Sequence, residues 1–375
     1  MLSVAIVGCG KIADQHAEQI LRIPGSQIVA VCDREELMAR QLQERLNIPA
    51  HFTEVEDLLA KAEPDVVHVT TPPQTHYALG KLCLEAGCHV YIEKPFTVTF
   101  DEAEELISMA ERRDLKLTVG HNAQFSHAAN RMRKLVQEGF LGGFPLHVES
   151  YYCYDLGDAG YAKALLGDSS HWVRNLPGGL LQNTISHGIS KIAEFLTDDD
   201  PEVIAYGFTS PLLKNIGENA IVDELRVIIH DSTTTAYFTF SSQMRPSLHL
   251  VRLYGPKNGL IMDEQQQTVI KIRGARYKSY LEQFLPPWDY ATQYLSNSLG
   301  NMKKFAIADF QMNYGMKFLI RALYRSIVEG RPAPIPYQEI LHTSRIMDEI
   351  FSQLRLARGA AELKAANRGL VGHNS

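Results

Sequence analysis

The chain is poor in cysteine, in basic clusters and in long apolar runs, and each shortage excludes a class of protein. Its five cysteines contain no C-x-x-C pair, and such a small, odd number suits a reducing compartment better than a disulfide framework. No apolar run approaches the roughly 18 residues of a membrane span. The short run Val4–Val7 follows Met1 without a basic flank, so we expect no signal peptide and predict a soluble, cytoplasmic protein.

Positive charge is also scarce: 37 Lys and Arg residues stand against 43 Asp and Glu residues, a net charge of −6. No cluster of Lys and Arg is dense enough to follow a phosphate backbone, so we expect no nucleic-acid partner. Apolar residues, by contrast, make up 45% of the 375 residues. A length beyond the usual ~100 to 200 residues per domain predicts two domains with separate cores.

The first part of the chain alternates short β-branched runs with amphipathic stretches. The runs are Val4–Val7, Ile28–Cys32, Val66–Thr70, His89–Ile92 and Leu115–Val119. This alternation predicts a doubly wound parallel sheet over residues 1–122. One intervening helix is marked by Asp101 and Glu104, which have the spacing of a capping box.

After residue 122 the pattern changes to strands without regular helical crossovers. One helix is predicted near residues 126–139, and the strand-like runs are His147–Tyr152, Glu202–Phe208, Glu224–Ile229, Thr234–Phe240 and Leu248–Leu253. Such a series predicts a mainly antiparallel sheet. We therefore predict an α/β protein with a second α/β domain over 123–358 and a flexible tail over 359–375.

The segment after the first run has the spacing G-x-G-x-x-A and opens a helical pattern, as a dinucleotide-binding turn does. Asp33 ends the second run, at the distance expected of the acid that binds a ribose diol, which favours NAD. Arg34 follows directly and can meet a 2′-phosphate, so NADP stays open. The turn residues expected at the cofactor are Gly8, Gly10, Lys11, Ile12 and Ala13.

Glu93, Lys94 and Pro95 follow the fourth run, where open α/β sheets place their ligands. Oxidation of an alcohol requires a group that removes the hydroxyl proton. An oxidised nicotinamide is cationic and lowers the pKa of a neighbouring lysine, so Lys94 is suited to that task. A surface turn is the alternative interpretation of this tripeptide.

Gly178 and Gly179 precede a helical pattern that carries polar, uncharged residues opposite its apolar stripe. Asn183 and His187 are four residues apart, so their side chains lie one above the other and can address the same small molecule. The pattern indicates a pocket wall. A polar helix seam, satisfied by backbone partners, is the alternative.

Together these motifs resemble the glucose-fructose oxidoreductase / inositol dehydrogenase / rhizopine catabolism (Gfo/Idh/MocA) family. Further agreement comes from Thr71-Pro72 with His76, from Glu138-Gly139 with Leu141-Gly142, and from the segment 254–259. The resemblance implies a Rossmann domain followed by a large, open, mostly antiparallel sheet that often mediates dimers or tetramers. It therefore implies a homodimer or homotetramer and no metal.

The resemblance also implies roles for individual residues. Lys94 takes part in proton transfer, Glu93 positions it, and a cis peptide precedes Pro95. His187 is the acid/base partner on the substrate hydroxyl, assisted by Asn183. Glu93 also positions the nicotinamide ribose. The further residues that the resemblance places at the cofactor are Thr71, Pro72, His76, Glu93, Lys94 and Asn122.

The substrate class implied by the resemblance is a sugar, nucleotide sugar or polyol. Polyol-oxidising members commonly have Asp where this chain has Asn183, and Asn there is similar to members acting on nucleotide sugars. Pro73 replaces an Asn, and Gln124 replaces an Arg of the family pattern. The residues that we expect near the substrate are Gln124, Trp172 and Arg174, with His171 beside them, although a packed loop would explain the last three equally well.

The sequence leaves two alternative functions and the role of one segment undecided. Some relatives use tightly held NAD in glycoside cleavage, and others are regulators that bind dinucleotide without catalysis. We expect an oxidoreductase acting on CH-OH groups, because Lys94 and His187 are both present. The aromatic-rich segment 275–315 is expected to pack against another subunit or to cover a ligand.

Overall fold

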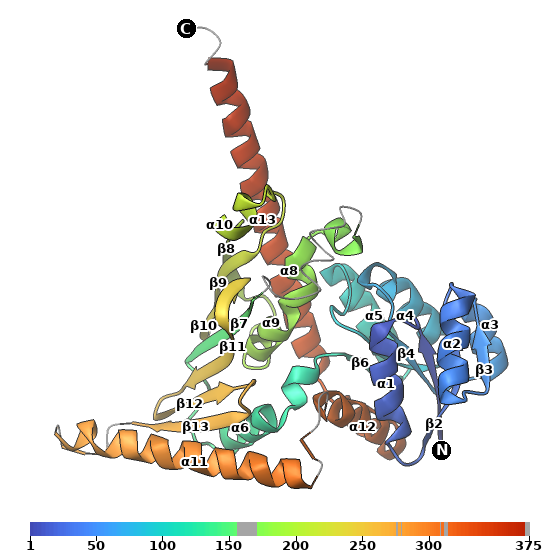
Figure 1. The fold of residues 1–375 in the computed structure, drawn as a ribbon, viewed down its shortest axis with the longest axis horizontal. Helices are drawn as coiled ribbons and strands as arrows, with labels where there is room; N and C mark the ends of the chain where they lie inside the picture. The colour runs from blue at the N-terminus through green and yellow to red at the C-terminus, as the bar shows by residue number, and fades with distance from the viewer. Residues whose placement is uncertain (156–170, 275–276, 279, 308, 311–313, 372–375) are drawn as a thin grey trace.

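The computed structural model describes residues 1–155, 171–274, 277–278, 280–307, 309–310 and 314–371, with side chains as far as residue 359, and contains two sheets (Figure 1). The first has six parallel strands in the order β3-β2-β1-β4-β5-β6. Its strands are β1 (Leu2–Val7), β2 (Ser26–Cys32), β3 (Ala50–Phe52), β4 (Val66–Val69), β5 (His89–Ile92) and β6 (Leu117–Val119). The predicted doubly wound parallel sheet is confirmed. The prediction missed β3, which has three half-buried residues and too short a pattern to detect.

Helices connect these strands on both faces of the sheet. They are α1 (Lys11–Leu21), α2 (Glu36–Leu46), α3 (Val55–Ala62), α4 (His76–Glu85) and α5 (Phe100–Arg112). α5 starts at a capping box formed by Thr99 and Glu102. The predicted box of Asp101 with Glu104 is therefore wrong by two residues, because Thr99 already supplies the cap and Asp101 lies inside the first turn.

The second sheet has seven strands in the order β13-β12-β11-β7-β10-β9-β8. Its strands are β7 (His147–Asp155), β8 (Glu202–Phe208), β9 (Glu224–His230), β10 (Thr235–Ser241), β11 (Gln243–Tyr254), β12 (Asn258–Asp263) and β13 (Thr268–Arg273). All pairs are antiparallel except β7 with β10. The predicted mainly antiparallel sheet is confirmed, and β12 and β13 extend it.

One face of this sheet is covered by helices (Figure 1). The helices of this half are α6 (His127–Gln137), α8 (Gly179–Thr184), α9 (Ser186–Ala193), α10 (Pro211–Asn215) and α11 (Leu285–Ala306). α9 packs on β7, α6 on β12 and β13, and α11 runs beside β13. The aromatic-rich segment 275–315 is thus largely a helix at the sheet edge, and its Trp288 and Phe305 are exposed.

Two late helices join the halves. α12 (Tyr314–Glu329) contributes Met316, Leu319 and Leu323 to the core of the first sheet, although the predicted boundary at residue 122 assigned them to the second domain. α13 (Tyr337–Val371) contacts both α5 and α9. It remains helical to Val371, through most of the segment predicted as a flexible tail. No helix in the described ranges is long and apolar enough to cross a membrane.

Candidate functional site

The turn between β1 and α1 has room for a ligand on its outer side only. Gly8 has φ +94°, and a Cβ there would lie 2.7 Å from Cγ2 of Thr71, so only glycine fits. Gly10 precedes α1, and a Cβ there would meet nothing within 4 Å. Because no side chain caps this helix, its first N–H groups are open to an anion such as a pyrophosphate. The turn therefore fits a dinucleotide.

Asp33 lies beside this turn at the end of β2. Its Oδ2 accepts a hydrogen bond from the Cys9 amide at 2.7 Å, and its Oδ1 accepts one from the Glu35 amide at 2.9 Å. These bonds hold the carboxylate next to the site of the pyrophosphate, where an adenosine ribose would lie. Arg34 is fully in solvent and 3.9 Å from Glu35. Lys11 is exposed, Ile12 is half-buried and Ala13 is buried against the sheet.

His76 has a different position from the one predicted. It is completely buried, and its ring nitrogens lie 2.9 Å from the Pro95 carbonyl and 2.8 Å from the Thr71 carbonyl. His76 therefore connects the loop after β4 to the loop after β5 and supports the site from beneath. Of the neighbouring predicted residues, Pro72 is exposed and Thr71 is half-buried at the rim of the glycine turn.

Glu93 ends β5 and is the first member of a buried hydrogen-bonded chain. Its Oε1 lies 2.9 Å from Nε2 of His16, whose Nδ1 lies 2.8 Å from Nδ1 of His68. Nε2 of His68 in turn lies 2.9 Å from the hydroxyl of Tyr324 on α12. Burial alone would raise the pKa of Glu93, but the hydrogen bond from His16 and the charge of Lys94 lower it overall. Glu93 is thus held as a carboxylate beside Lys94.

Lys94 projects from the same loop towards the second half of the molecule. Its Nζ donates a hydrogen bond to the Asn183 carbonyl at 3.1 Å, and the peptide bond to Pro95 is cis, as predicted. Burial lowers the pKa of Lys94, while Glu93 raises it in part. An ammonium with a lowered pKa gives up a proton more readily than a surface lysine does.

His187 lies in the first turn of α9 and faces the same region. Its ring centroid lies 6.2 Å from that of His121 and 5.7 Å from that of Tyr152, and its Nδ1 is buried with no hydrogen-bond partner among the described residues. Burial, followed by Lys94 and His121, lowers the pKa of His187 well below its ordinary value. The imidazole is therefore neutral and can accept a proton.

The helix carrying Asn183 and His187 differs from the single helix predicted over 178–196. It is divided at Ile185, where α8 ends and α9 begins. Gly178 lies against Phe351 of α13, where a Cβ would approach to 2.3 Å. Gly178 therefore permits helix packing, whereas a Cβ at Gly179 would meet nothing within 4 Å and its glycine is favoured by a φ of +53°.

A wall opposite His187 was missed by the sequence analysis. Tyr152 on β7 stacks on His249 of β11 at 4.3 Å, and its hydroxyl accepts a hydrogen bond from Tyr154 at 2.6 Å. Lys191 of α9 lies 5.3 Å from the Tyr152 ring and forms an ion pair with Glu264. The alternation of Tyr152 and Tyr154 places them on one face, but only the pairing of β7 with β11 brings His249 beside them.

His121 and Asn122 complete the floor between the two halves. Burial lowers the pKa of His121 to about 3, so its ring is neutral beside Lys94 and His187. The Oδ1 of Asn122 accepts a hydrogen bond from the Tyr91 hydroxyl at 2.9 Å, which anchors Asn122 at the end of β6.

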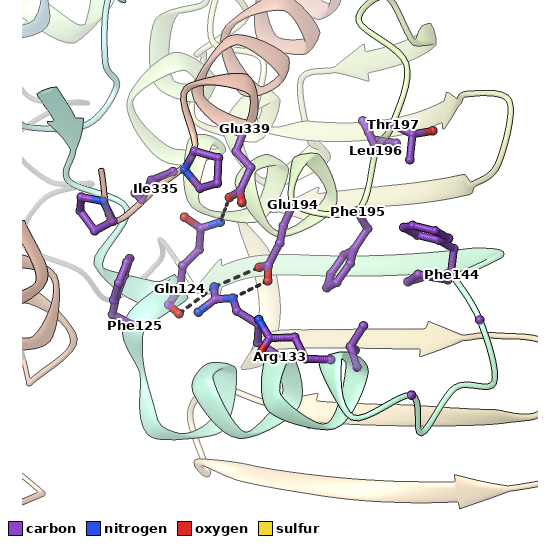
Figure 2. Close-up of a pocket in the computed structure, with 17 residues that line it drawn as sticks. Gln124, Phe125, Arg133, Phe144, Glu194, Phe195, Leu196, Thr197, Ile335 and Glu339 are labelled. Carbon is purple, nitrogen blue, oxygen red and sulfur yellow. Dashed lines mark hydrogen bonds and ion pairs between the residues drawn. The ribbon is translucent and has the colours of Figure 1, made fainter. Parts of the chain in front are cut away.

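The predicted substrate residues are in three different environments. Gln124 is buried, and its Nε2 donates hydrogen bonds to Glu339 and to the Ser190 carbonyl (Figure 2). Arg174 forms an ion pair with Glu218 at 3.0 Å. The Trp172 carbonyl accepts a hydrogen bond from Gln74, in the loop after β4, at 3.3 Å. Of the three, Trp172 thus lies next to the predicted cofactor loops.

The N-terminal third of the chain matches the profile of a known family. Residues 2–121 match the profile of GFO_IDH_MocA, described as an oxidoreductase family with an NAD-binding Rossmann fold. This segment contains the glycine turn, Asp33, Glu93 and Lys94, and it ends one residue before Asn122. The first sheet with its helices is therefore an NAD-binding Rossmann domain.

Two curated relatives match over part of their length. The D-glucoside 3-dehydrogenase of Escherichia coli K12 is 34% identical over 142 residues, which are 38% of this chain and 40% of the relative. The UDP-N-acetylglucosamine 3-dehydrogenase of Acidithiobacillus ferrooxidans is 36% identical over 149 residues, 40% of this chain and 44% of the relative. The chain thus spans less than half the length of these relatives.

A solved structure agrees over nearly the whole chain. The WlbA dehydrogenase from Bordetella pertussis, in complex with NADH and UDP-GlcNAcA, superposes with a TM-score of 0.73. It is 14% identical and covers 95% of this chain and 96% of its own. The likeness shows that the two chains share the same fold in both halves.

Proposed function

We propose that this chain, a member of the Gfo/Idh/MocA oxidoreductase family, transfers a hydride between NAD and a secondary alcohol or ketone of a carbohydrate. One observation carries the proposal. Lys94 extends from the Rossmann domain to the Asn183 carbonyl, next to the neutral imidazole of His187. A cationic hydrogen-bond donor and a neutral imidazole near the carboxyl end of β5 support this function, because an open α/β sheet binds its ligand there.

NAD, when bound, supplies the hydride chemistry, and the side chains of this chain handle the proton. In the oxidative direction the neutral imidazole of His187 accepts the hydroxyl proton of the substrate. Lys94 donates a hydrogen bond to the same oxygen and stabilises the negative charge that develops on it. Glu93 holds the backbone of Lys94, since its Oε2 accepts a hydrogen bond from the Lys94 amide at 3.1 Å.

The substrate that we propose is a sugar or nucleotide sugar. Three observations support this class. The wall of Tyr152, Tyr154 and His249 offers aromatic faces with polar edges, which suit a sugar ring. Asn183 takes the place of the carboxylate common in relatives that oxidise free polyols. The names of both curated relatives, moreover, describe dehydrogenation at position 3 of a glucoside or nucleotide sugar.

The test is an assay of NADH formation with NAD or NADP and a panel of glucosides, nucleotide sugars and inositol. We expect turnover with at least one glucoside or nucleotide sugar. Lys94→Ala and His187→Ala should each lower kcat by about 100- to 10,000-fold while NAD still binds. Lys61→Ala, which removes an exposed lysine on α3, is the matched control and should leave kcat unchanged.

Other results would point elsewhere. Turnover of inositol alone would overturn the substrate class. Cleavage of a coloured glycoside without net NADH would indicate the glycoside-cleaving chemistry, and NAD binding without any turnover would indicate a regulator.

We further propose that the protein works in the cytoplasm as a homodimer or homotetramer. All five cysteines are free thiols in buried positions, as suits a reducing compartment. The uncovered face of the second sheet carries exposed apolar side chains, among them Ile204, Ile228 and Tyr237, which suit contact with another subunit.

A further inference from the structure

A cavity of about 670 Å³ lies at the junction of α6, the end of α9 and the start of α13 (Figure 2). Its volume is within the range of sites for small organic ligands. Most of its lining is apolar, with Phe125, Val136, Phe195 and Ile335 among its walls. Its lining residues do not include Lys94, Asn183 or His187, so it is separate from the proposed catalytic site.

The polar residues of this cavity carry two carboxylates and one guanidinium. Arg133 contacts both oxygens of Glu194, at 2.5 and 3.2 Å, and so compensates that charge. Among the described residues, the carboxylate of Glu339 accepts a hydrogen bond from the neutral Gln124 amide alone, at 3.3 Å. Within the described ranges no Lys, Arg or His side chain lies within salt-bridge distance of Glu339. The cavity therefore has one carboxylate, that of Glu339, which no cation of the described residues pairs directly.

A second, independent group in the same cavity lacks a partner. Gln124 is 2% exposed, and its Oε1 is buried without a hydrogen bond. Its Nε2 donates to the Ser190 carbonyl, which can only accept, so the amide orientation follows and the oxygen has no donor among the described residues. A carboxylate without an ion-pair partner, next to an amide whose oxygen has no donor, favours a ligand that supplies N–H donors and positive charge.

We propose that this cavity binds a small amphipathic amine, with its ammonium group at Glu339 and Gln124 and its hydrocarbon body against Phe125, Val136 and Phe195. Apolar walls favour an organic cation over a hydrated inorganic one. Among the residues that the structure describes, no three His, Cys, Asp or Glu side chains gather as metal ligands, so an amine fits better than a metal ion. Neither NAD nor a sugar has this combination of charge and apolarity.

The charge state of Glu339 supports this assignment. Burial, followed by the negative charge of Glu194, raises the pKa of Glu339 to about 7. The positive charge of Arg133 and the hydrogen bond from Gln124 lower this pKa in part. A carboxylate that is costly to ionise gains from a cationic ligand. An alkylamine stays protonated up to a pH of ~10, like a lysine side chain, so its affinity should rise as the pH increases through 7.

The test uses the full chain and three probes of equal length: hexylamine, hexanol and hexanoate. Binding is measured by calorimetry in phosphate buffer at pH 6 and pH 8, because amine buffers would compete. We expect hexylamine to bind at least about tenfold more tightly than hexanol at pH 8, a difference of ~1.4 kcal/mol, and hexanoate to bind least. The preference for hexylamine should shrink at pH 6.

Glu339→Gln keeps the size of the side chain and the acceptor for Gln124, so it should fold, as circular dichroism can verify. We expect it to remove the preference for hexylamine and to leave hexanol unchanged. Glu349→Gln, on the same helix but outside the cavity, is the matched control. Equal binding of hexylamine and hexanol to the wild type, no binding of either, or an unchanged preference in Glu339→Gln would each overturn the proposal.

Discussion

At the scale of single residues, Gly8 and Gly10 have different reasons to be glycine. Gly8 is required by the fold, because its φ is positive and a Cβ would also lie 2.9 Å from the Thr70 backbone. Gly10 has ordinary backbone angles, and a Cβ there meets open space. Within the protein alone Gly10 therefore has no steric need to be glycine. The bound dinucleotide supplies the need.

This difference predicts opposite outcomes for two alanine variants. Gly10→Ala should leave the melting temperature unchanged and weaken NAD binding by about tenfold or more, a loss of ~1.4 kcal/mol, because the methyl group contacts only the ligand. Gly8→Ala should lower stability by about 1–3 kcal/mol through strain at a positive φ. Thermal denaturation and calorimetry with NAD measure both, and a Gly10→Ala protein that binds NAD normally would contradict the assignment of this turn.

Glu93 is the second residue for which the structure makes a prediction, here about pH. Its pKa is lower in the folded protein than in the unfolded chain, so its contribution to stability is present above pH ~4.5 and is lost as the pH falls through the lowered value. Glu93→Gln should therefore lose stability at pH 7, by about 1.5–3 kcal/mol for a hydrogen bond to a charged group. The difference from wild type should shrink as the pH falls from 7 towards 3.

Urea unfolding at both pH values measures this difference, and Glu104→Gln, an exposed carboxylate on α5, is the control. A constant difference between pH 7 and pH 3 would show that the chain from His16 to Tyr324 stabilises Glu93 by packing, without a contribution from its charge.

At the scale of elements, the approach of α9 to β7 determines where His187 points. Gly188 permits this approach, since a Cβ there would lie 2.3 Å from Phe238 and 2.9 Å from Cβ of Tyr152. Gly188→Ala should force α9 away from the sheet, at a cost of about 1–3 kcal/mol in the free energy of unfolding. It should also reduce turnover, because His187 is the preceding residue.

Gly300 in α11 is a matched control for this prediction. It is also helical, but a Cβ there meets nothing within 4 Å, so Gly300→Ala should stabilise the protein by about 0.5–1 kcal/mol through helix propensity. Urea unfolding of the two variants should give opposite signs. Equal effects would mean that the contact between α9 and β7 does not limit stability.

α11 also explains how the sheet ends. The carboxamides of Gln293 and Asn297, one turn apart, bond the backbone N–H and C=O groups of Lys271 and Val269 on β13. These bonds satisfy the groups that an edge strand would otherwise present to other chains. The outer face of α11 remains exposed, so the aromatic residues of this segment lie at the surface, where the sequence allowed either a subunit contact or a ligand cover.

At the scale of the whole molecule, the uncovered face of the second sheet predicts self-association. Ile228 on β9 lies directly between Ile204 on β8 and Tyr237 on β10, and the three side chains are 40–66% exposed. Such a row of neighbouring apolar side chains indicates an interface. Ile228→Lys should convert a dimer or tetramer to a smaller species, as light scattering after gel filtration would show.

Val328→Lys, which replaces an apolar residue of α12 that is 71% exposed, is the control and should leave the mass unchanged. Identical masses for wild type and both variants would contradict an interface on this sheet face.

The sequence by itself predicted the Rossmann domain and two parts of the candidate site, the cofactor turn and the loop that carries Lys94. The glycine turn, Asp33 and Lys94 could be predicted because local geometry requires them at fixed places relative to consecutive strands. The parallel first sheet and the mainly antiparallel second sheet followed from hydrophobic patterns of period 2 and 3.6, whereas the order of the strands in each sheet came from the structure. Such patterns indicate which face of an element is buried, but they do not indicate which other element covers that face.

Tertiary structure alone decided which distant residues meet. His249 reaches Tyr152 only through the pairing of β11 with β7, and His68 reaches Tyr324 across 256 positions of sequence. It also buried His76 beneath the cofactor loops and turned Gln124 towards Glu339, where the sequence had predicted ligand contacts. Side-chain environments such as these depend on packing between elements, and no periodicity along one chain segment encodes the partner that another segment supplies.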